Sequence, residues 1–458
     1  MTSSAIPHPP EFRPPDFGQP DLRAPDHRAV LAIAVPMTLG YMTTPLVGLV
    51  DMAVVGRLGE PALIGGVAIG SVICDVGFTT FNFLRSGTTG LTAQAVGRGD
   101  RPEMLATLMR ALVLAGLAGL LMMLAAPAAA LAGRAVFGGS PAVMEAMATY
   151  VLIRLLGAPL VLANFALFGW LLGLGRAGAG LVLQTVLNGV NVAAAVGLVL
   201  GAGWGVAGAA WAAVAADAVT LALGLALLAR TRDRSAWPGW ARVIDRPAVL
   251  AMLGTNRDIM IRSFVLLAAF AFFTRQSALQ GDLVLAANAI LEKFFLFGGY
   301  FLDGFAAAAE TFVGRAVGAR RRDIYDRALI LTAIWGFALA GLVSATLWAA
   351  GPALLALMTS ATAVAETARL YLVWAALTPL AGVLAFQMDG VFIGATWSRD
   401  MRNMMLVSLV VYLAAWALLM PAFGNHGLWL ALLIFLGVRG LSLGWISRRR
   451  AAETFGAR

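Results

Sequence analysis

Cysteine, histidine and charged residues are all scarce in this chain of 458 residues. Cys74 is the only cysteine, which excludes a disulfide framework and a thiolate metal site. The only histidines are His8, His27 and His426, so a membrane enzyme with a histidine base or a histidine-rich metal centre has little support. We therefore expect that the protein is not an enzyme and that it holds no cofactor and no metal.

Charged residues make up 12% of the chain, whereas hydrophobic residues make up 60% and the mean hydropathy is +0.83. A soluble protein of this composition could not cover its surface in water. The apolar runs also reach the ~20 residues that a helix needs to span a bilayer. The composition therefore predicts an all-α polytopic membrane protein.

Apolar segments separated by short polar loops predict twelve transmembrane helices. We place these helices at residues 29–55, 61–97, 102–132, 141–173, 177–200, 205–231, 248–278, 282–318, 323–350, 362–396, 402–422 and 426–446. Several of them are longer than a spanning helix needs to be, so we expect tilts or kinks.

The second half of the chain repeats landmarks of the first half at an offset of 221 residues. Residues 95–97 (AVG) match residues 316–318, and Gly169 matches Gly390. Further landmarks keep this offset over roughly eighty residues, which indicates a duplicated unit of six helices in one orientation. Two such membrane-embedded halves around a shared cavity are typical of an alternating-access transporter.

Composition also divides the chain into segments. Residues 1–28 are polar and rich in proline, which predicts a disordered tail. We expect an N-terminal lobe at residues 29–231 and a C-terminal lobe at residues 247–447, each with six helices. Residues 232–246 are polar and basic and would link the lobes, and residues 448–458 would form a basic tail.

Arginine residues are concentrated in the loops on one side of the predicted helices. They are Arg98, Arg101, Arg232, Arg234, Arg242, Arg246, Arg320, Arg321, Arg322, Arg399 and Arg402. Because positive residues favour the cytoplasmic side, we expect both termini in the cytoplasm and the chain in the inner membrane. The arginines that give the net charge of +9 follow this pattern, so we expect no nucleic acid as a partner. The expected partners are lipid and small organic compounds, and we expect the protein to be a monomer.

Acidic residues lie within the predicted helices, where an ionised side chain costs roughly 2.5–3.5 kcal/mol. Such groups must be protonated, paired or in contact with water. A carboxyl group whose hydration changes as a cavity opens and closes can take up and release protons with conformation. We therefore predict that coupling protons or cations bind to acids of this group, namely Asp51, Asp217, Asp303, Glu310 and Asp389.

Polar side chains also recur at helical spacing along two of the predicted helices. Asn82 and Arg85 lie on the second helix, and Gln184, Asn188 and Asn191 lie on the fifth. A polar stripe on an apolar helix faces protein or water and not lipid. We predict that these residues line a substrate cavity, and the alternative is that they form hydrogen bonds between packed helices.

Five segments together resemble the multidrug and toxic compound extrusion (MATE) family, and specifically its DinF branch. They are VDMAVVGRLG (50–59), FNFLRSGTTGLTAQAVGRGD (81–100), NRDIMIRSF (256–264), YFLDGFAAAAETFVGRAVGAR (300–320) and DGVFIGATWSRDMRNMM (389–405). The resemblance implies two six-helix lobes in a V that opens alternately to each side of the membrane. It also implies export of bulky organic, often cationic or amphipathic, compounds in exchange for protons or sodium ions.

The resemblance also implies roles for particular residues. Asp51 resembles the first-helix aspartate that takes the coupling proton, and Pro36 resembles the proline at which that helix bends. Asn191 resembles the asparagine of an N-x-x-x-D pattern, but Ala195 occupies the place of the aspartate. We expect Asp217 to substitute for that missing acid.

The coupling ion is expected to be the proton. Sodium-using relatives of the NorM branch carry a glutamate on the seventh helix, whereas residues 263–281 contain no acid. Asp389 nevertheless resembles an acid of the tenth helix in the C-terminal lobe, so coupling to sodium stays open.

Three other functions compete with export. A flippase for lipid-linked precursors, from the same superfamily, would need cationic cavity residues, and Arg85 and Lys293 are the only clear cations that we place inside the helices. A membrane enzyme would need a nucleophile–base pair or a metal centre. A passive channel would more naturally use symmetric rings, whereas the polar faces of the two repeats differ. These features favour the exporter.

Overall fold

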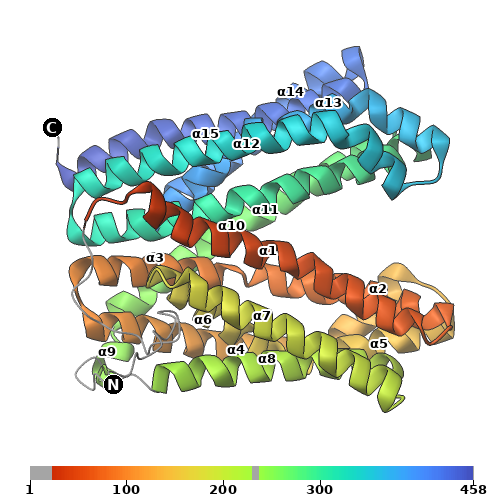
Figure 1. Ribbon diagram of the computed structural model, residues 1–458, viewed down its shortest axis with the longest axis horizontal. Helices are drawn as coiled ribbons and strands as arrows, with labels where there is room; N and C mark the ends of the chain where they lie inside the picture. Colours follow the sequence, from red (N-terminus) through yellow and green to blue (C-terminus); the bar gives the residue numbers. More distant parts are fainter. Residues whose placement is uncertain (1–22, 230–236, 457–458) are drawn as a thin grey trace, which may run out of the picture. The chain divides into compact units, whose positions relative to one another are not determined.

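The computed structural model describes residues 23–229 and 237–456, without the side chains of residues 44–47, 49 and 51. This part of the chain is almost entirely helical and contains no strand (Figure 1). The helices are α1 (His27–Gly56), α2 (Pro61–Thr80), α3 (Phe83–Arg98), α4 (Arg101–Phe137), α5 (Pro141–Leu156), α6 (Ala158–Gly173), α7 (Ala177–Ala195), the π-helix η2 (Val196–Gly201), α8 (Gly205–Ala229), α9 (Trp240–Val243), α10 (Arg246–Ala278), α11 (Asp282–Ala319), α12 (Arg322–Met358), α13 (Thr362–Gly394), α14 (Ser398–Phe423) and α15 (Asn425–Phe455). The predicted all-α class is confirmed.

Each of the twelve predicted helices corresponds to a helical segment of the structure. The second consists of α2 and α3, the fourth of α5 and α6, and the fifth of α7 and η2. Within the described ranges, nine helices are long and apolar enough to cross a membrane, and the pair α5–α6 raises this number to ten. Helices α1 and α10 complete the twelve segments.

The fourth predicted helix is broken and not continuous. Helices α5 and α6 meet at an angle of 51°. Gly157 separates them, and Pro159 follows within the first turn of α6. Proline has no N–H group and its ring clashes with the preceding turn, so Pro159 favours a bend at this point. The membrane segment predicted over residues 141–173 thus consists of two helices with a bend between them, as expected for the longer segments.

The described residues form two compact units. The first unit contains Thr43–Thr88 and Gly99–Val249, and the second contains Leu22–Met42, Thr89–Arg98 and Leu250–Arg458. Helices α1 and α3 therefore each contribute one part to each unit. The predicted lobes were divided by chain order, so they did not include this sharing of α1 and α3 between the two units. The exact boundaries of the lobes stay a prediction.

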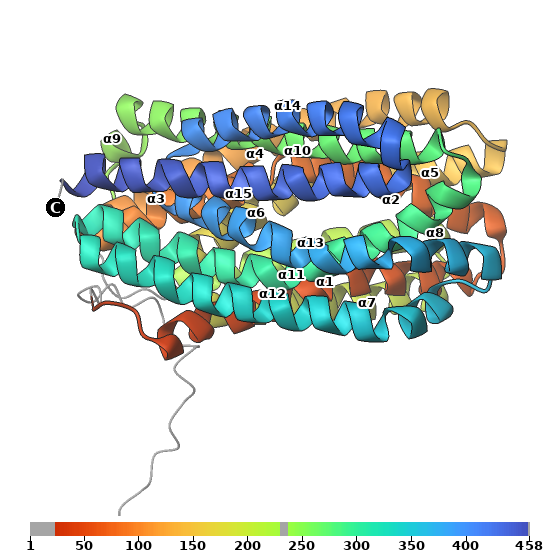
Figure 2. The same cartoon turned by 90° about the horizontal axis from the view of Figure 1, so that it is seen from above.

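Each unit has its own apolar core. In the first unit, α2 packs against α5, α4 against α6, and α8 against α5 and α7, around buried residues such as Met147 and Val151. In the second unit, α13 packs against α11, α12 and α15, and α14 packs against α15 (Figures 1 and 2). Phe273, Tyr412 and Trp429 are among its buried residues. Apolar faces on several helices of each unit are thus buried against one another.

The 221-residue offset reappears in the packing of glycine residues. A Cβ atom on Gly169 of α6 would lie 2.2 Å from the carbonyl oxygen of Arg85 on α3. At the equivalent places, a Cβ atom on Gly390 of α13 would lie 2.1 Å from the carbonyl oxygen of Ala306 on α11. Only glycine fits at such a distance, so the repeated glycines mark the same backbone contact in each half.

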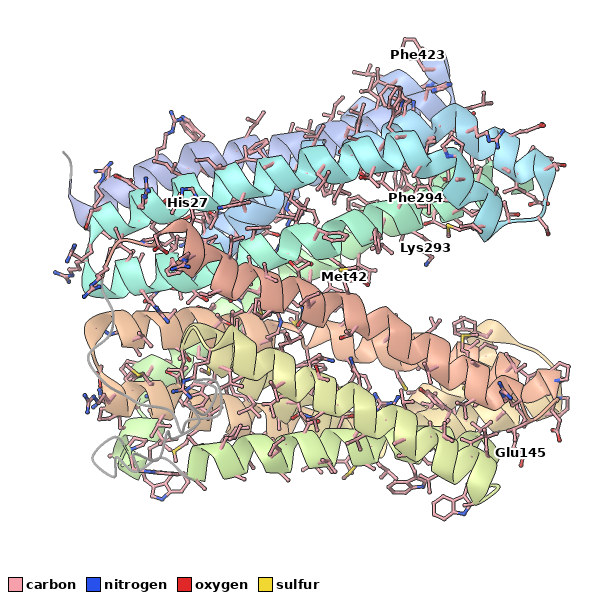
Figure 3. All side chains as sticks on the ribbon, in the orientation of Figure 1. His27, Met42, Glu145, Lys293, Phe294 and Phe423 are labelled. Carbon is pink, nitrogen blue, oxygen red and sulfur yellow. The ribbon has the colours of Figure 1, made fainter. Side chains whose placement is uncertain are left out.

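The first part of α1 packs closely on α11 within the second unit. A Cβ atom on Gly304 would lie 2.0 Å from Oγ1 of Thr38 and 2.6 Å from the carbonyl oxygen of Ala34. His27 lies at the beginning of α1 (Figure 3). Its Nδ1 atom accepts a hydrogen bond of 3.1 Å from Nε1 of Trp335 on α12. These contacts fix the first part of α1 to the second unit.

Candidate functional site

A cluster of charged side chains surrounds Asp389 on α13 in the second unit. Its Oδ2 atom accepts hydrogen bonds from Arg262 on α10 and Arg439 on α15. The side chains of Arg439, Asp389 and Arg262 are 3%, 10% and 14% exposed, respectively. Asp303 on α11 also acts electrostatically on Arg439. The cluster therefore joins two cations and two acids from α10, α11, α13 and α15.

The close packing of α11 against α13 brings predicted acids together. Gly390 and Gly394 of α13 leave no room for a side chain against the backbone of α11, where Gly394 meets the carbonyl oxygen of Glu310. Glu310 itself is buried on α11, and Asp303 is half-buried two turns earlier on the same helix. Three of the predicted coupling acids thus lie on two adjoining helices of the second unit.

Asp217 lies in a different cluster, in the first unit. It accepts a hydrogen bond of 3.2 Å from Nη1 of Arg154 on α5, and Nδ2 of Asn164 on α6 donates to it as well. The guanidinium group of Arg154 lies 5.2 Å from the centre of the Phe78 ring, close enough for a cation–π interaction. Arg154 also acts electrostatically on Asp75 of α2. Asp217 is therefore one half of a buried ion pair.

The expectation that Arg85 and Lys293 are the only clear cations inside the helices is wrong. Arg154, Arg262 and Arg439 lie within α5, α10 and α15, and each bonds to an acid on another helix. Lys293 lies on α11 and is exposed, whereas its neighbour Phe294 is buried in the core of the second unit (Figure 3). The absence of in-helix cations can no longer count against a flippase. All three arginines fall inside predicted helices, which was the signal that could have identified them.

The predicted cavity residues form two local groups in the first unit. Nε of Arg85 on α3 donates a hydrogen bond of 3.3 Å to Oδ1 of Asn82, which directly precedes that helix. On α7, Nε2 of Gln184 donates a hydrogen bond of 3.1 Å to Oδ1 of Asn188, one turn away, and Asn191 is buried. Asn82 is exposed, whereas Arg85, Gln184 and Asn188 are half-buried. A role in a substrate cavity stays a prediction for all of them.

Asp51 and Pro36 lie on α1 but in different units. Asp51 belongs to the part of α1 in the first unit, and its side chain is outside the described structure. Pro36 belongs to the part in the second unit, and α1 is helical without a break from His27 to Gly56. The predicted proton-binding role of Asp51 and hinge role of Pro36 stay predictions.

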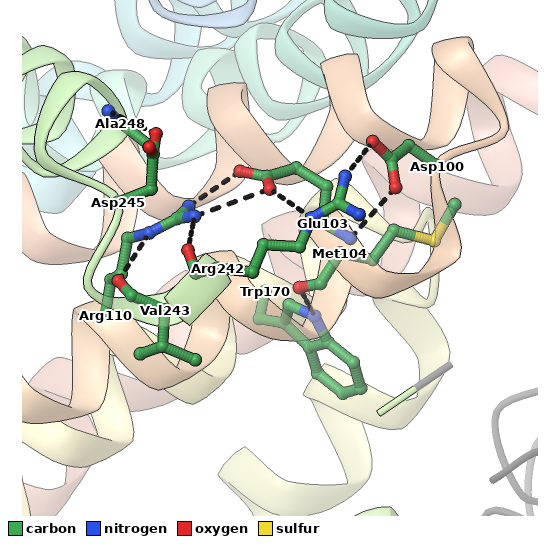
Figure 4. Close-up of polar contacts among 9 residues, drawn as sticks. All are labelled: Asp100, Glu103, Met104, Arg110, Trp170, Arg242, Val243, Asp245 and Ala248. Carbon is green, nitrogen blue, oxygen red and sulfur yellow. Dashed lines mark hydrogen bonds and ion pairs between the residues drawn. The ribbon is translucent and has the colours of Figure 1, made fainter. Parts of the chain in front are cut away.

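The linker helix α9, which the sequence did not predict, is held against α4 in the first unit. Arg110 of α4 donates hydrogen bonds to the carbonyl oxygens of Arg242 (2.6 Å) and Val243 (3.0 Å). Arg110 and Arg242 both pair with Glu103, and Arg242 also pairs with Asp100, the N-cap residue of α4 (Figure 4). Because Arg110 is buried, this network fixes one end of the linker to the first unit.

Metal binding has no support in the described part of the chain. No group of three or more histidine, cysteine, aspartate or glutamate side chains lies close enough together there to hold a metal ion. The clusters around Asp217 and Asp389 each contain arginine, whose positive charge opposes a metal ion.

Comparison with known proteins identifies the family. The MatE family matches residues 36–196 and 259–416, which lie in the two predicted lobes and make up more than half of the chain. DNA damage-inducible protein F of Escherichia coli (strain K12) is 40% identical over 435 residues, which cover 92% of each chain. The probable multidrug resistance protein NorM of Caulobacter vibrioides is 28% identical over 442 residues, which cover 90% of this chain and 86% of the relative.

Solved structures show the same fold. A MATE protein in its bent conformation superimposes with a TM-score of 0.84 at 20% identity, and the match covers 96% of this chain and 97% of that protein. A transporter of the MOP superfamily from Pyrococcus furiosus superimposes with a TM-score of 0.82 at 19% identity, over 95% and 98% of the two chains. The predicted resemblance is thus confirmed in sequence and in fold, and the chain belongs to the MatE family of membrane transporters.

Proposed function

We propose that this transporter is a proton-coupled antiporter that exports bulky organic compounds, often cationic or amphipathic, across the inner membrane by alternating access. The observation that carries this proposal is the division of α1 between the two units. Helix α1 contains Asp51 in the first unit and Pro36 in the second. In the second unit, Gly304 allows α1 to pack closely on α11. A change of charge or shape along α1 would therefore act on both units.

The structure of the second unit favours protons over sodium ions as the coupling species. A sodium ion at Asp389 would have to approach a carboxylate that already binds the guanidinium groups of Arg262 and Arg439. Repulsion between the like charges would oppose this. Asp303 and Glu310 on α11 are the acids through which a sodium-coupled exporter of the same fold would have to operate.

A flippase for lipid-linked precursors is the second candidate. Arg262 and Arg439 converge on one point and could bind an anionic group such as a pyrophosphate. For the structurally similar transporter from Pyrococcus furiosus, a reverse polarity of the binding pocket has been taken to suggest a different function. The polarity of the binding pocket has thus been linked to function in a protein of this fold.

Transport by purified protein tests these alternatives. In sodium-free proteoliposomes, we expect an imposed pH gradient to drive the movement of a fluorescent organic cation, and Asp51→Asn to abolish it. Transport that requires sodium would instead indicate coupling through Asp303 and Glu310. Movement of a pyrophosphate-linked lipid between leaflets, with no movement of the dye under either gradient, would favour the flippase.

A further inference from the structure

We propose that Arg262 and Arg439 form a binding site for the anionic group of an amphipathic organic compound, and that Asp389 occupies this site as an internal anion. The ligand would carry a carboxylate, sulfonate or phosphate group on an apolar body. The proposal extends the proposed export function to substrates of this class and rests on that function for the ligand to be a transported compound.

The two guanidinium groups reach one point from different helices. Arg262 on α10 and Arg439 on α15 both donate to Oδ2 of Asp389. Nε of each arginine and Oδ1 of Asp389 are buried and have no hydrogen-bond partner among the described residues. Guanidinium groups usually bind an anion through two parallel N–H groups, so a single carboxylate oxygen leaves much of this capacity unused.

An ion cluster of the same unit provides a contrast. Asp258 on α10 uses both carboxylate oxygens: Oδ1 accepts from Arg402 at 2.7 Å and from Arg257 at 3.2 Å, and Oδ2 accepts from Ser398 at 3.4 Å. Both carboxylate oxygens of Asp258 thus accept hydrogen bonds, whereas only Oδ2 of Asp389 does. Incomplete bonding around Asp389 is what a site for an external anion requires.

The charge balance of the site depends on Asp389. Arg262 and Arg439 are balanced by Asp389 and by Asp303 on α11, which acts on Arg439, so an anion that takes the place of Asp389 at the two arginines keeps this balance at the site. Burial of such a triad costs desolvation energy, and ion triads of this kind are often no more stabilising than apolar residues. Within a membrane protein, ionisable side chains of this kind more often mark a path or binding site for a substrate.

The site is also not sealed from its surroundings. Arg262 and Asp389 retain some exposure, whereas Arg439 behind them is almost fully buried. A ligand could therefore reach Arg262 first and take the place of Asp389 at both arginines. Apolar side chains on the surrounding helices would contact the rest of the ligand.

Equilibrium binding of two matched dyes tests the proposal. Rhodamine B carries a free carboxylate beside its cationic ring system, and its ethyl ester keeps the ring system but has an uncharged ester in place of the carboxylate. In phosphatidylcholine nanodiscs, we expect Arg262→Gln and Arg439→Gln each to weaken binding of rhodamine B by about tenfold or more. Binding of the ester should change less than about twofold, because the ester offers the arginines no negative charge. Arg402→Gln, which removes the same charge elsewhere in the second unit, should change neither affinity.

The replacement of Asp389 distinguishes a binding site from a structural clamp. Asp389→Asn removes the internal anion, so it should strengthen binding of rhodamine B. If the cluster only holds the helices together, Asp389→Asn should instead weaken binding of both dyes, as the arginine variants would, and this result would overturn the proposal. Arg439→Lys keeps the positive charge but removes the paired N–H groups of the guanidinium. An intermediate loss of rhodamine B affinity in this variant supports the site even if Arg439→Gln fails to fold.

Two further comparisons identify the source of the anion and separate this proposal from export. Phosphatidylglycerol in the nanodiscs should lower the affinity for rhodamine B only if its acidic headgroup competes for the same arginines. An unchanged affinity would show that the site binds the anionic group of a dissolved compound and not a lipid headgroup. Because the measurement uses no ion gradient, arginine-dependent binding without transport would refute the export function and leave the site intact. Binding of rhodamine B that does not depend on either arginine would refute the site alone.

Discussion

Arg154 on α5 and Asp217 on α8 form a buried ion pair with an N–O distance of 3.2 Å. These helices belong to the fourth and sixth membrane segments of the first half, and the same two segments of the second half are joined by Asp389 on α13 and Arg439 on α15. The acid and the base have exchanged places between the halves. The duplicated architecture thus keeps an ionic link between equivalent helices but reverses its polarity.

The first prediction concerns the stability of this link. Arg154→Gln should lower the free energy of unfolding by about 3–5 kcal/mol, because it leaves the charge of Asp217 buried without its partner. The double variant Arg154→Gln with Asp217→Asn should recover part of this loss, since neither charge then remains. Unfolding of the single and double variants in detergent gives a double-mutant cycle, and additive effects of the two substitutions would contradict the ion pair.

The second prediction concerns the contact between α1 and α11. Gly304→Ala should lower the free energy of unfolding by about 1–3 kcal/mol, because the new methyl group would overlap Thr38 and the backbone at Ala34. Gly341→Ala on α12 is the matched control, since a Cβ atom there meets no other atom within 4 Å. Thermal unfolding of the two variants in detergent measures the difference. Equal melting temperatures would show that α1 does not pack on α11 in this way.

The third prediction concerns the linker helix α9. Arg110→Gln removes the donors that hold the carbonyl groups of Arg242 and Val243, so α9 should leave α4 more often. The native Cys74 can be replaced by serine, and Val243→Cys then places a single thiol at a site that is 3% exposed. Maleimide should label this thiol about tenfold faster in the Arg110→Gln background, as expected for the loss of bonds to a charged group. Arg98→Gln, at an exposed position, should leave the rate unchanged, and an equal rate in both backgrounds would refute the clamp.

The sequence predicted the helices because their signal is local. Runs of apolar residues and the 221-residue repeat were sufficient to place twelve segments, and the repeated Gly169 and Gly390 mark equivalent backbone contacts in the structure. The division of α1 and α3 between the units could not be predicted in this way. Which helix packs in which unit depends on contacts between distant segments, and hydrophobic periodicity carries no information about them.

The partners of the buried acids were missed for the same reason. Asp217 and Asp389 were identified as costly charges inside apolar helices, but their partners Arg154 and Arg439 lie 63 and 50 residues away in the chain. The periodicity of one helix shows which of its faces is polar and does not show which helix that face meets. Charge balance offered a partial signal, since a buried acid needs a counter-charge and arginines were present in the same segments.

Proton movement coupled to substrate movement tests the central claim most directly. We propose to load sodium-free proteoliposomes with the pH indicator pyranine, to hold the membrane potential at zero, and to add a colourless organic cation outside without any initial pH gradient. Antiport predicts that protons leave as the cation enters, so the internal pH should rise with the wild-type protein and stay constant with Asp51→Asn. Entry of the cation at the same rate in both proteins with no change in the internal pH would contradict proton-coupled antiport.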